Sequence, residues 1–192
     1  MSTTAPAERL GPLPIEQMSR EQKEANADFI NTRGIGFSGG PWQAFIRSPE
    51  LMTHTQRMGE YLRYRCPISG KLSELAILLV AREWTQDYEF GAHRKHGLKA
   101  GISQATVDAI TEGRRPEGLP QDEQVVWDFV TEIQRAKRVS DTTYARALEM
   151  FGEQGVVDLA GIVGYYSHLA LVMNVTRIAP PEGEPRLPRF PE

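Results

Sequence analysis

The sequence has little of what several classes of protein require. It contains one cysteine, Cys66, so no disulfide can form within the chain. The formal net charge is −3, and the Lys and Arg residues are scattered rather than gathered into a basic face, which argues against nucleic-acid binding. The longest apolar run is far short of the roughly 20 residues of a membrane helix, and the first residues lack a secretion-signal pattern. We therefore expect a cytoplasmic protein with neither a nucleic-acid nor a membrane partner.

Strand signals are also missing, whereas helix signals recur. No alternating run is bounded by an Asn-Gly or Asp-Gly turn. Ser19 and Gln22 have capping-box spacing, and Pro49 follows Ser48 as a residue at the first helical position should. With 192 residues, the sequence predicts one all-α domain over residues 15–178, with about seven or eight helices.

The two ends differ from this helical region. Residues 1–14 are rich in Pro, Ala and Thr and are expected to form a flexible arm. Residues 179–192, "APPEGEPRLPRFPE", contain five prolines, which cannot continue a helix. This tail is therefore expected to be extended, and it is either loose or lies along a neighbouring subunit.

Two predicted helices, 72–84 and 155–176, are apolar on nearly every side. Helices of this kind lie in the middle of a protein or in a subunit interface. Two of them favour a homo-oligomer, although a single domain can also bury both.

Glu74 begins the first of these apolar helices, flanked by Leu72, Leu75 and Leu78. As a first-turn carboxylate it would face solvent, favoured by the helix dipole. Alternatively it is half-buried, with a proton affinity raised by desolvation, as functional carboxylates often are.

The segment "EWTQDYEFGAH" (83–93) contains a second candidate group. Glu89 and His93 are four residues apart and share a helix face, with His96 as a further neighbour. This pattern suits a solvated salt-bridged face, a proton-transfer histidine, or, as a weak signal, a metal site built from all three residues.

Glu74 and His93 would be about 28 Å apart in one straight helix, too far to cooperate. Thr85 and Asp87 are candidate caps for a new helix between them. A turn there would fold the helix bearing His93 back beside the helix bearing Glu74, and would place the site in the crevice between them.

The blocks "GGPWQAFIRSPEL", "LSELAILLVAREWTQDYEFGAH", "HGLKAGIS" and "FGEQGVVDLAGIVGYYSHLALVMN" together resemble the carboxymuconolactone decarboxylase family, whose superfamily includes alkyl hydroperoxidase D. The resemblance covers most of the chain. It implies an all-α fold and a homo-oligomer, which would be a dimer, trimer or hexamer.

The peroxidase branch of that superfamily has a Glu, then C-x-x-C, then a His four residues after the second Cys. Here Glu74 and His93 match the Glu and the His, but Gln86 and Glu89 replace the two cysteines. A disulfide relay needs a low-pKa thiolate and a resolving thiol, so this peroxidase mechanism is disfavoured.

The decarboxylase branch lacks the cysteines too. By this resemblance, we expect a cofactor-free and metal-free lyase that acts on a small carboxylated lactone or related aromatic-catabolism intermediate. His93 would donate a proton to the enolate left by loss of carbon dioxide, and Glu74 or Glu89 would hold the imidazole or act as the base. Arg82 or Lys95 would bind a substrate carboxylate.

Other residues are candidates for contact with the substrate. The expected substrate-binding set comprises Arg82, Trp84, Gln86, Tyr88, Tyr166 and Asn174. The same site would also suit a proton-transfer isomerase or a lactone ring-opening hydrolase, and a non-enzymatic oligomer that binds a small ligand is a further alternative.

Overall fold

The computed structural model describes residues 7–37 and 39–189, and all regular structure in these ranges is helical. The expected all-α fold is therefore confirmed, with eight α-helices and one short 3-10 helix among the described residues. The elements are η1 (Ile15–Gln17), α1 (Arg20–Arg33), α2 (Pro41–Phe45), α3 (Pro49–Tyr64), α4 (Gly70–Glu83), α5 (Asp87–Ala100), α6 (Gln104–Thr111), α7 (Gln121–Ala136) and α8 (Asp141–Thr176).

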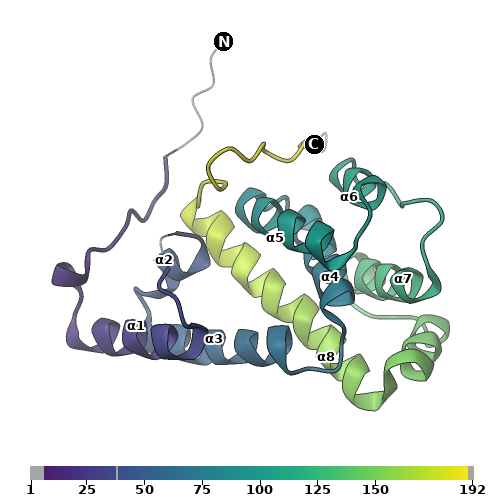
Figure 1. Cartoon of the computed structure of the whole chain (residues 1–192), viewed down its shortest axis with the longest axis horizontal. Helices are drawn as coiled ribbons and strands as arrows, with labels where there is room; N and C mark the ends of the chain where they lie inside the picture. Colours follow the sequence, from purple (N-terminus) through teal and green to yellow (C-terminus); the bar gives the residue numbers. More distant parts are fainter. Residues whose placement is uncertain (1–6, 38, 190–192) are drawn as a thin grey trace, which may run out of the picture.

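Helix α4 forms the centre of the core. It packs against α5, α7 and α8, and its eleven residues from Leu72 to Arg82 are all buried. Figure 1 shows α8 running diagonally across the molecule, with α1 and α3 side by side along one edge. An apolar helix covered on several sides is the arrangement expected for residues 72–84.

Helix α8 is bent at Gly152, which adopts φ 67° and ψ 178° in the middle of the helix. The bend separates the two helices expected over 140–152 and 155–176. Among the described residues, α8 is the one helix whose length and composition would also suit a membrane span, with a mean hydropathy of 1.5 in its most apolar window. However, 56% of that window is buried within the protein, and buried core helices pass the same test.

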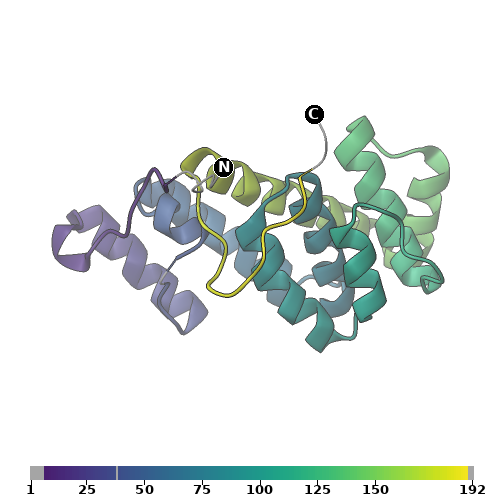
Figure 2. The same cartoon turned by 90° about the horizontal axis from the view of Figure 1, so that it is seen from above.

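The described part of the proline-rich tail lies on the outer face of α5 in its own chain, rather than away from it (Figure 2). The Leu187 side chain is buried, and the Leu187 backbone N–H donates to Asp87 Oδ1 at 2.9 Å. Residues 7–14 are also attached, since the Arg9 backbone N–H donates to the Thr176 carbonyl at 2.9 Å. The remainder of both predicted terminal segments, residues 1–6 and 190–192, lies outside the described residues.

Candidate functional site

A tight turn between α4 and α5 brings the two halves of the site together. Thr85 adopts a positive φ of 47°, and Gln86 then caps α5 by accepting hydrogen bonds from the backbone N–H groups of Tyr88 (2.7 Å) and Glu89 (3.3 Å). The expected turn is present, but the prediction that Thr85 or Asp87 supplies the cap is wrong. The longer Gln86 side chain folds over the first turn and accepts from two of its free N–H groups.

The turn folds His93 back onto Glu74, nineteen residues earlier in the chain. His93 Nδ1 and Glu74 Oε2 are 2.6 Å apart, and both side chains are buried. Arg63 Nη2 lies 3.4 Å from the other carboxylate oxygen, Oε1. Glu74 is thus a buried, paired carboxylate, and the alternative of a solvent-facing first-turn residue is wrong.

The protonation of this pair follows from its surroundings. Burial opposes ionisation of Glu74, but the hydrogen bond from His93 and the charge of Arg63 favour the carboxylate, and the pKa of Glu74 is lowered. Burial lowers the pKa of His93 despite the opposing effect of Glu74. A neutral His93 donates Nδ1–H to the ionised Glu74, which leaves the lone pair on Nε2.

The pKa of Glu89 is shifted in the opposite direction to that of Glu74. Its side chain is buried, and desolvation raises its pKa well above the ordinary value. Its Oε2 atom has no hydrogen-bond partner in the described part of the chain. A buried carboxyl without a partner stays protonated and keeps an O–H to donate. Glu89 and His93 therefore do not form the solvated salt-bridged face that was one alternative.

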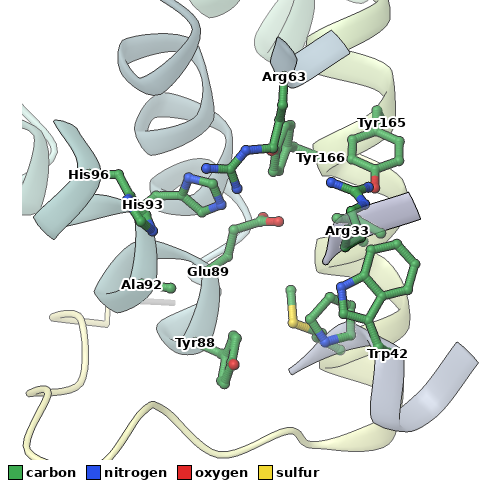
Figure 3. Close-up of a pocket in the computed structure, with 13 residues that line it drawn as sticks. Arg33, Trp42, Arg63, Tyr88, Glu89, Ala92, His93, His96, Tyr165 and Tyr166 are labelled. Carbon is green, nitrogen blue, oxygen red and sulfur yellow. The ribbon is translucent and has the colours of Figure 1, made fainter. Parts of the chain in front are cut away.

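Arg63, Glu89 and His93 border a pocket of about 170 Å³. Figure 3 shows Arg63, Glu89 and His93 pointing into the same space. Glu74 is not on the pocket wall but lies behind the His93 ring, and it therefore orients the imidazole rather than meeting a ligand. The lining residues are Arg33, Pro41, Trp42, Arg63, Tyr88, Glu89, Ala92, His93, His96, Tyr165, Tyr166, Leu169 and Met173.

Arg33 is a site residue that sequence reasoning missed. Its guanidinium lies 5.7 Å from the Trp42 ring centre and 5.9 Å from those of Phe29 and Tyr64. Its Nη2 donates to the Gln56 carbonyl at 2.7 Å, whereas its buried Nε has no hydrogen-bond partner among the described residues. An aromatic cage can hold a cation in place by cation–π attraction while its charge remains available to an anion.

Arg63 and Trp42 were also missed, although each lies within or next to a segment that was singled out. Trp42 belongs to the block "GGPWQAFIRSPEL". Arg63 and Arg33 occupy helix positions that are typical of solvated surface charges, and no local pattern distinguishes them. Only the packing of α1 on α3, and of α3 on α8, brings them to the pocket.

Of the six expected substrate-binding residues, Tyr88 and Tyr166 line the pocket. Gln86 and Asn174 instead bond to each other at 3.0 Å, and Asn174 Nδ2 donates to the Trp84 carbonyl at 3.0 Å. These three residues tie the α4–α5 turn to the end of α8 and do not border this pocket.

Both expected carboxylate-binding residues also lie away from the pocket. Arg82 borders a separate, smaller cavity with Leu79 and Trp127. Lys95 Nζ lies 3.0 Å from Glu184 of the tail. The structure places Arg33 of α1 and Arg63 of α3 at the pocket instead.

Neither a metal site nor a reactive thiol is found in the part of the chain that the structure describes. In residues 7–37 and 39–189, no group of three His, Cys, Asp or Glu side chains is placed to hold a metal ion. Cys66 lies after α3 and does not line the pocket; its Sγ donates to the Leu62 carbonyl, and burial raises its pKa. The thiol therefore lacks the thiolate character of a redox centre.

No family model matches the chain, and no curated protein matches it. Solved structures do match. An uncharacterised peroxidase-related protein from Ralstonia eutropha JMP134, with an alkylhydroperoxidase AhpD core, has a TM-score of 0.73 at 12% identity, covering 93% of this chain and 95% of its own. The debrominase Bmp8, in complex with 2,3,4-tribromopyrrole, has a TM-score of 0.69 at 10% identity, covering 90% and 91%.

A third match is a protein of unknown function from Agrobacterium tumefaciens, described as an AhpD-type antioxidant defence protein. It has a TM-score of 0.64 at 14% identity and covers 71% of this chain and 94% of its own. At these identities the matches concern the fold. They show that the chain has the AhpD-like helical fold, as expected from the sequence.

Proposed function

We propose that the protein is a cofactor-free acid–base enzyme, a lyase that removes carbon dioxide from a small, planar, carboxylated compound such as an unsaturated lactone acid. The observation that carries this proposal is the state of two neighbouring groups in one pocket. His93 is held through Nδ1 by Glu74, which leaves Nε2 for proton transfer, and burial lowers its pKa. Glu89 lines the same pocket with an Oε2 atom that has no partner among the described residues, and burial raises its pKa, which favours the uncharged acid. Groups whose environments impose complementary roles of this kind are typical of acid–base sites.

The lining chemistry supports an anionic substrate with a flat ring. Arg33 and Arg63 are the cations of the pocket, and Trp42 and the tyrosines supply aromatic walls. Guanidinium groups bind carboxylates and oxyanions through paired N–H donors. The complex of Bmp8 with tribromopyrrole supports the idea that a protein of this fold accommodates a small planar ring.

The reaction would proceed without a cofactor. The C–CO₂⁻ bond breaks, its electron pair forms an enolate, and a guanidinium stabilises the oxyanion. Glu89 then donates its proton to the carbon that lost carbon dioxide. The sequence suggested His93 as the proton donor, but burial lowers its pKa, so we assign this step to Glu89 instead. The role of His93 is to return a proton to Glu89, held in one tautomer by Glu74.

Turnover of a panel of carboxylated lactones tests the proposal, followed by ultraviolet absorbance and by carbon dioxide release. We expect wild-type protein to release carbon dioxide and His93→Ala to lose about a hundredfold to ten-thousandfold in rate. His54→Asn is a matched control, since His54 is exposed and does not border the pocket. Equal inertness of wild type and His93→Ala across the panel, with tight binding of one member, would instead indicate a ligand-binding protein.

A proton-transfer isomerase is the second candidate. The same pair would serve it directly, because Nε2 of His93 would take a proton from one carbon and Glu89 would return one to another. Deuterium incorporation from D₂O without carbon dioxide release would favour the isomerase over the lyase.

We further propose that the protein is a homo-oligomer located in the cytoplasm. The support for assembly is that α8 leaves Val157, Leu171 and Val175 exposed on a helix with few charges. Light scattering of purified protein measures the assembly directly, and a monomer at micromolar concentration would contradict it.

A further inference from the structure

The proposed decarboxylation consumes one proton in every turnover. The substrate carboxylate leaves as carbon dioxide, and the proton that replaces it on carbon comes from Glu89. The Glu89 carboxylate must therefore be reprotonated from solvent before the next turnover. Glu89 is only 2% exposed, so water does not reach it freely from outside.

Most ionisable groups that line the pocket are unsuited to this transfer near neutral pH. Arg33 and Arg63 remain charged, since a guanidinium does not release its proton in proteins. Burial raises the pKa of Tyr88, Tyr165 and Tyr166, so these phenols remain protonated. The two histidines are the remaining titratable groups on the described pocket wall.

His96 is the one of these two histidines that solvent reaches. It lies one turn after His93 on α5, its side chain is exposed, and it still lines the pocket. The centres of the two imidazole rings are 5.8 Å apart, with the planes inclined at 58° (Figure 3). This separation suits transfer through a single bridging water molecule.

We propose that His96 carries protons from bulk solvent into the pocket, passing them through His93 to Glu89. This inference rests on the proposed function. A protonated His96 gives its proton through the bridging water to Nε2 of His93. The resulting imidazolium, stabilised by Glu74, gives the Nε2 proton to the Glu89 carboxylate. Each cycle returns all three side chains to their starting state and delivers one proton for each carbon dioxide released.

The test compares His96→Asn with wild type and with His54→Asn, an exposed histidine away from the pocket. At low buffer concentration, we expect steady-state turnover of His96→Asn to fall about tenfold or more, within the usual range for loss of a proton-transfer group. The first turnover should stay as fast as in wild type, because Glu89 begins protonated. Added imidazole should restore the steady-state rate. Turnover of His96→Asn equal to that of His54→Asn, in dilute buffer, would overturn the proposal.

An NMR measurement tests the proton path without any substrate. The ¹⁵N signal of His93 Nε2 reports how fast this atom gains and loses a proton, and we expect this exchange with solvent to be slower in His96→Asn than in either wild type or His54→Asn. Unchanged exchange would overturn the proton path. Slower exchange in a protein that turns over no lactone acid would retain the path and reject the proposed decarboxylation. Thermal unfolding of each variant reports whether it is folded.

Discussion

Asp87 and Glu89 are two buried acidic side chains that lie two residues apart in the first turn of α5, and their hydrogen-bonding surroundings are opposite. On the outer face, Asp87 receives hydrogen bonds from the Leu187 N–H (2.9 Å) and from Arg186 (3.2 Å) and Arg189 (2.7 Å) of the tail. On the inner face, Glu89 Oε2 has no partner within the described residues. A carboxylate surrounded by donors is a structural anchor, whereas a desolvated carboxyl without donors is a source of protons.

Other charged side chains on the outer face of α5 are also paired with the tail. Glu184 of the tail lies 3.3 Å from Arg94 and 3.0 Å from Lys95. Gly91 lies one turn before Arg94 on α5, and a Cβ there would be 3.0 Å from the Glu184 side chain. The tail therefore follows the outer face closely, while the inner face is left to the pocket.

The largest expected effect comes from removing the acid of the inner face while keeping its shape. Glu89→Gln should lose about a hundredfold to ten-thousandfold in turnover, because an amide has no proton to give. Asp87→Asn is the matched change on the outer face, and it should retain activity to within a few-fold. Carbon dioxide release measures both variants, and an active Glu89→Gln protein would remove the distinction between the two carboxylates.

The next effect concerns the anchor. Asp87→Ala removes a buried acceptor and leaves its donors to water, so we expect the free energy of unfolding to fall by about 1–3 kcal/mol. The half-exposed guanidiniums of Arg186 and Arg189 keep the loss toward the lower end, since solvent hydrates them once they are freed. Urea unfolding measures the change. Faster proteolysis within residues 179–189 should accompany it, and an unchanged midpoint together with an intact tail would contradict the anchoring role.

Titration of Glu89 should also make the free energy of unfolding depend on pH. Its folded pKa is raised above the ordinary value of 4.5, so the folded state binds the proton more tightly than the unfolded state. Stability contributed by the protonated form is complete below about pH 4.5 and is lost as pH rises toward the folded pKa. The free energy of unfolding of Glu89→Gln should therefore decrease less with rising pH than that of wild type. The variant should be the more stable protein near neutral pH. Urea midpoints measured from pH 4 to pH 8 check the sign.

The smallest effect should come from the charge pairs of the outer face. Glu184→Gln removes the attraction to Arg94 and Lys95, whose side chains are 34% and 66% exposed. We expect a loss of about 0.5 kcal/mol that shrinks as salt is added. A loss as large as that of Asp87→Ala would show that the tail depends on Glu184 as much as on Asp87.

Much of the fold could be predicted from local signals, because those signals act over one helical turn. The Ser19–Gln22 capping box is present with both of its hydrogen bonds, and Gly152 separates the two helices expected near the end of the chain. Ser48 precedes Pro49 as expected, but its side chain makes no capping bond. The α4–α5 turn was predicted for a geometric reason, since Glu74 and His93 cannot otherwise meet, and the resemblance to a known family identified the same two residues.

Local pattern alone determined that this chain is helical, that α4 is a buried helix, and that Glu89 and His93 share one face. Those features depend on apolar periodicity and on four-residue spacing, which the order of amino acids contains directly. Tertiary structure decided which carboxylate holds His93, which residues are the cations of the pocket, and that Asp87 is an anchor while Glu89 is an acid. These outcomes depend on burial and on partners contributed by α1, α3, α8 and the tail, and desolvation of a carboxyl is set by everything that surrounds it in space.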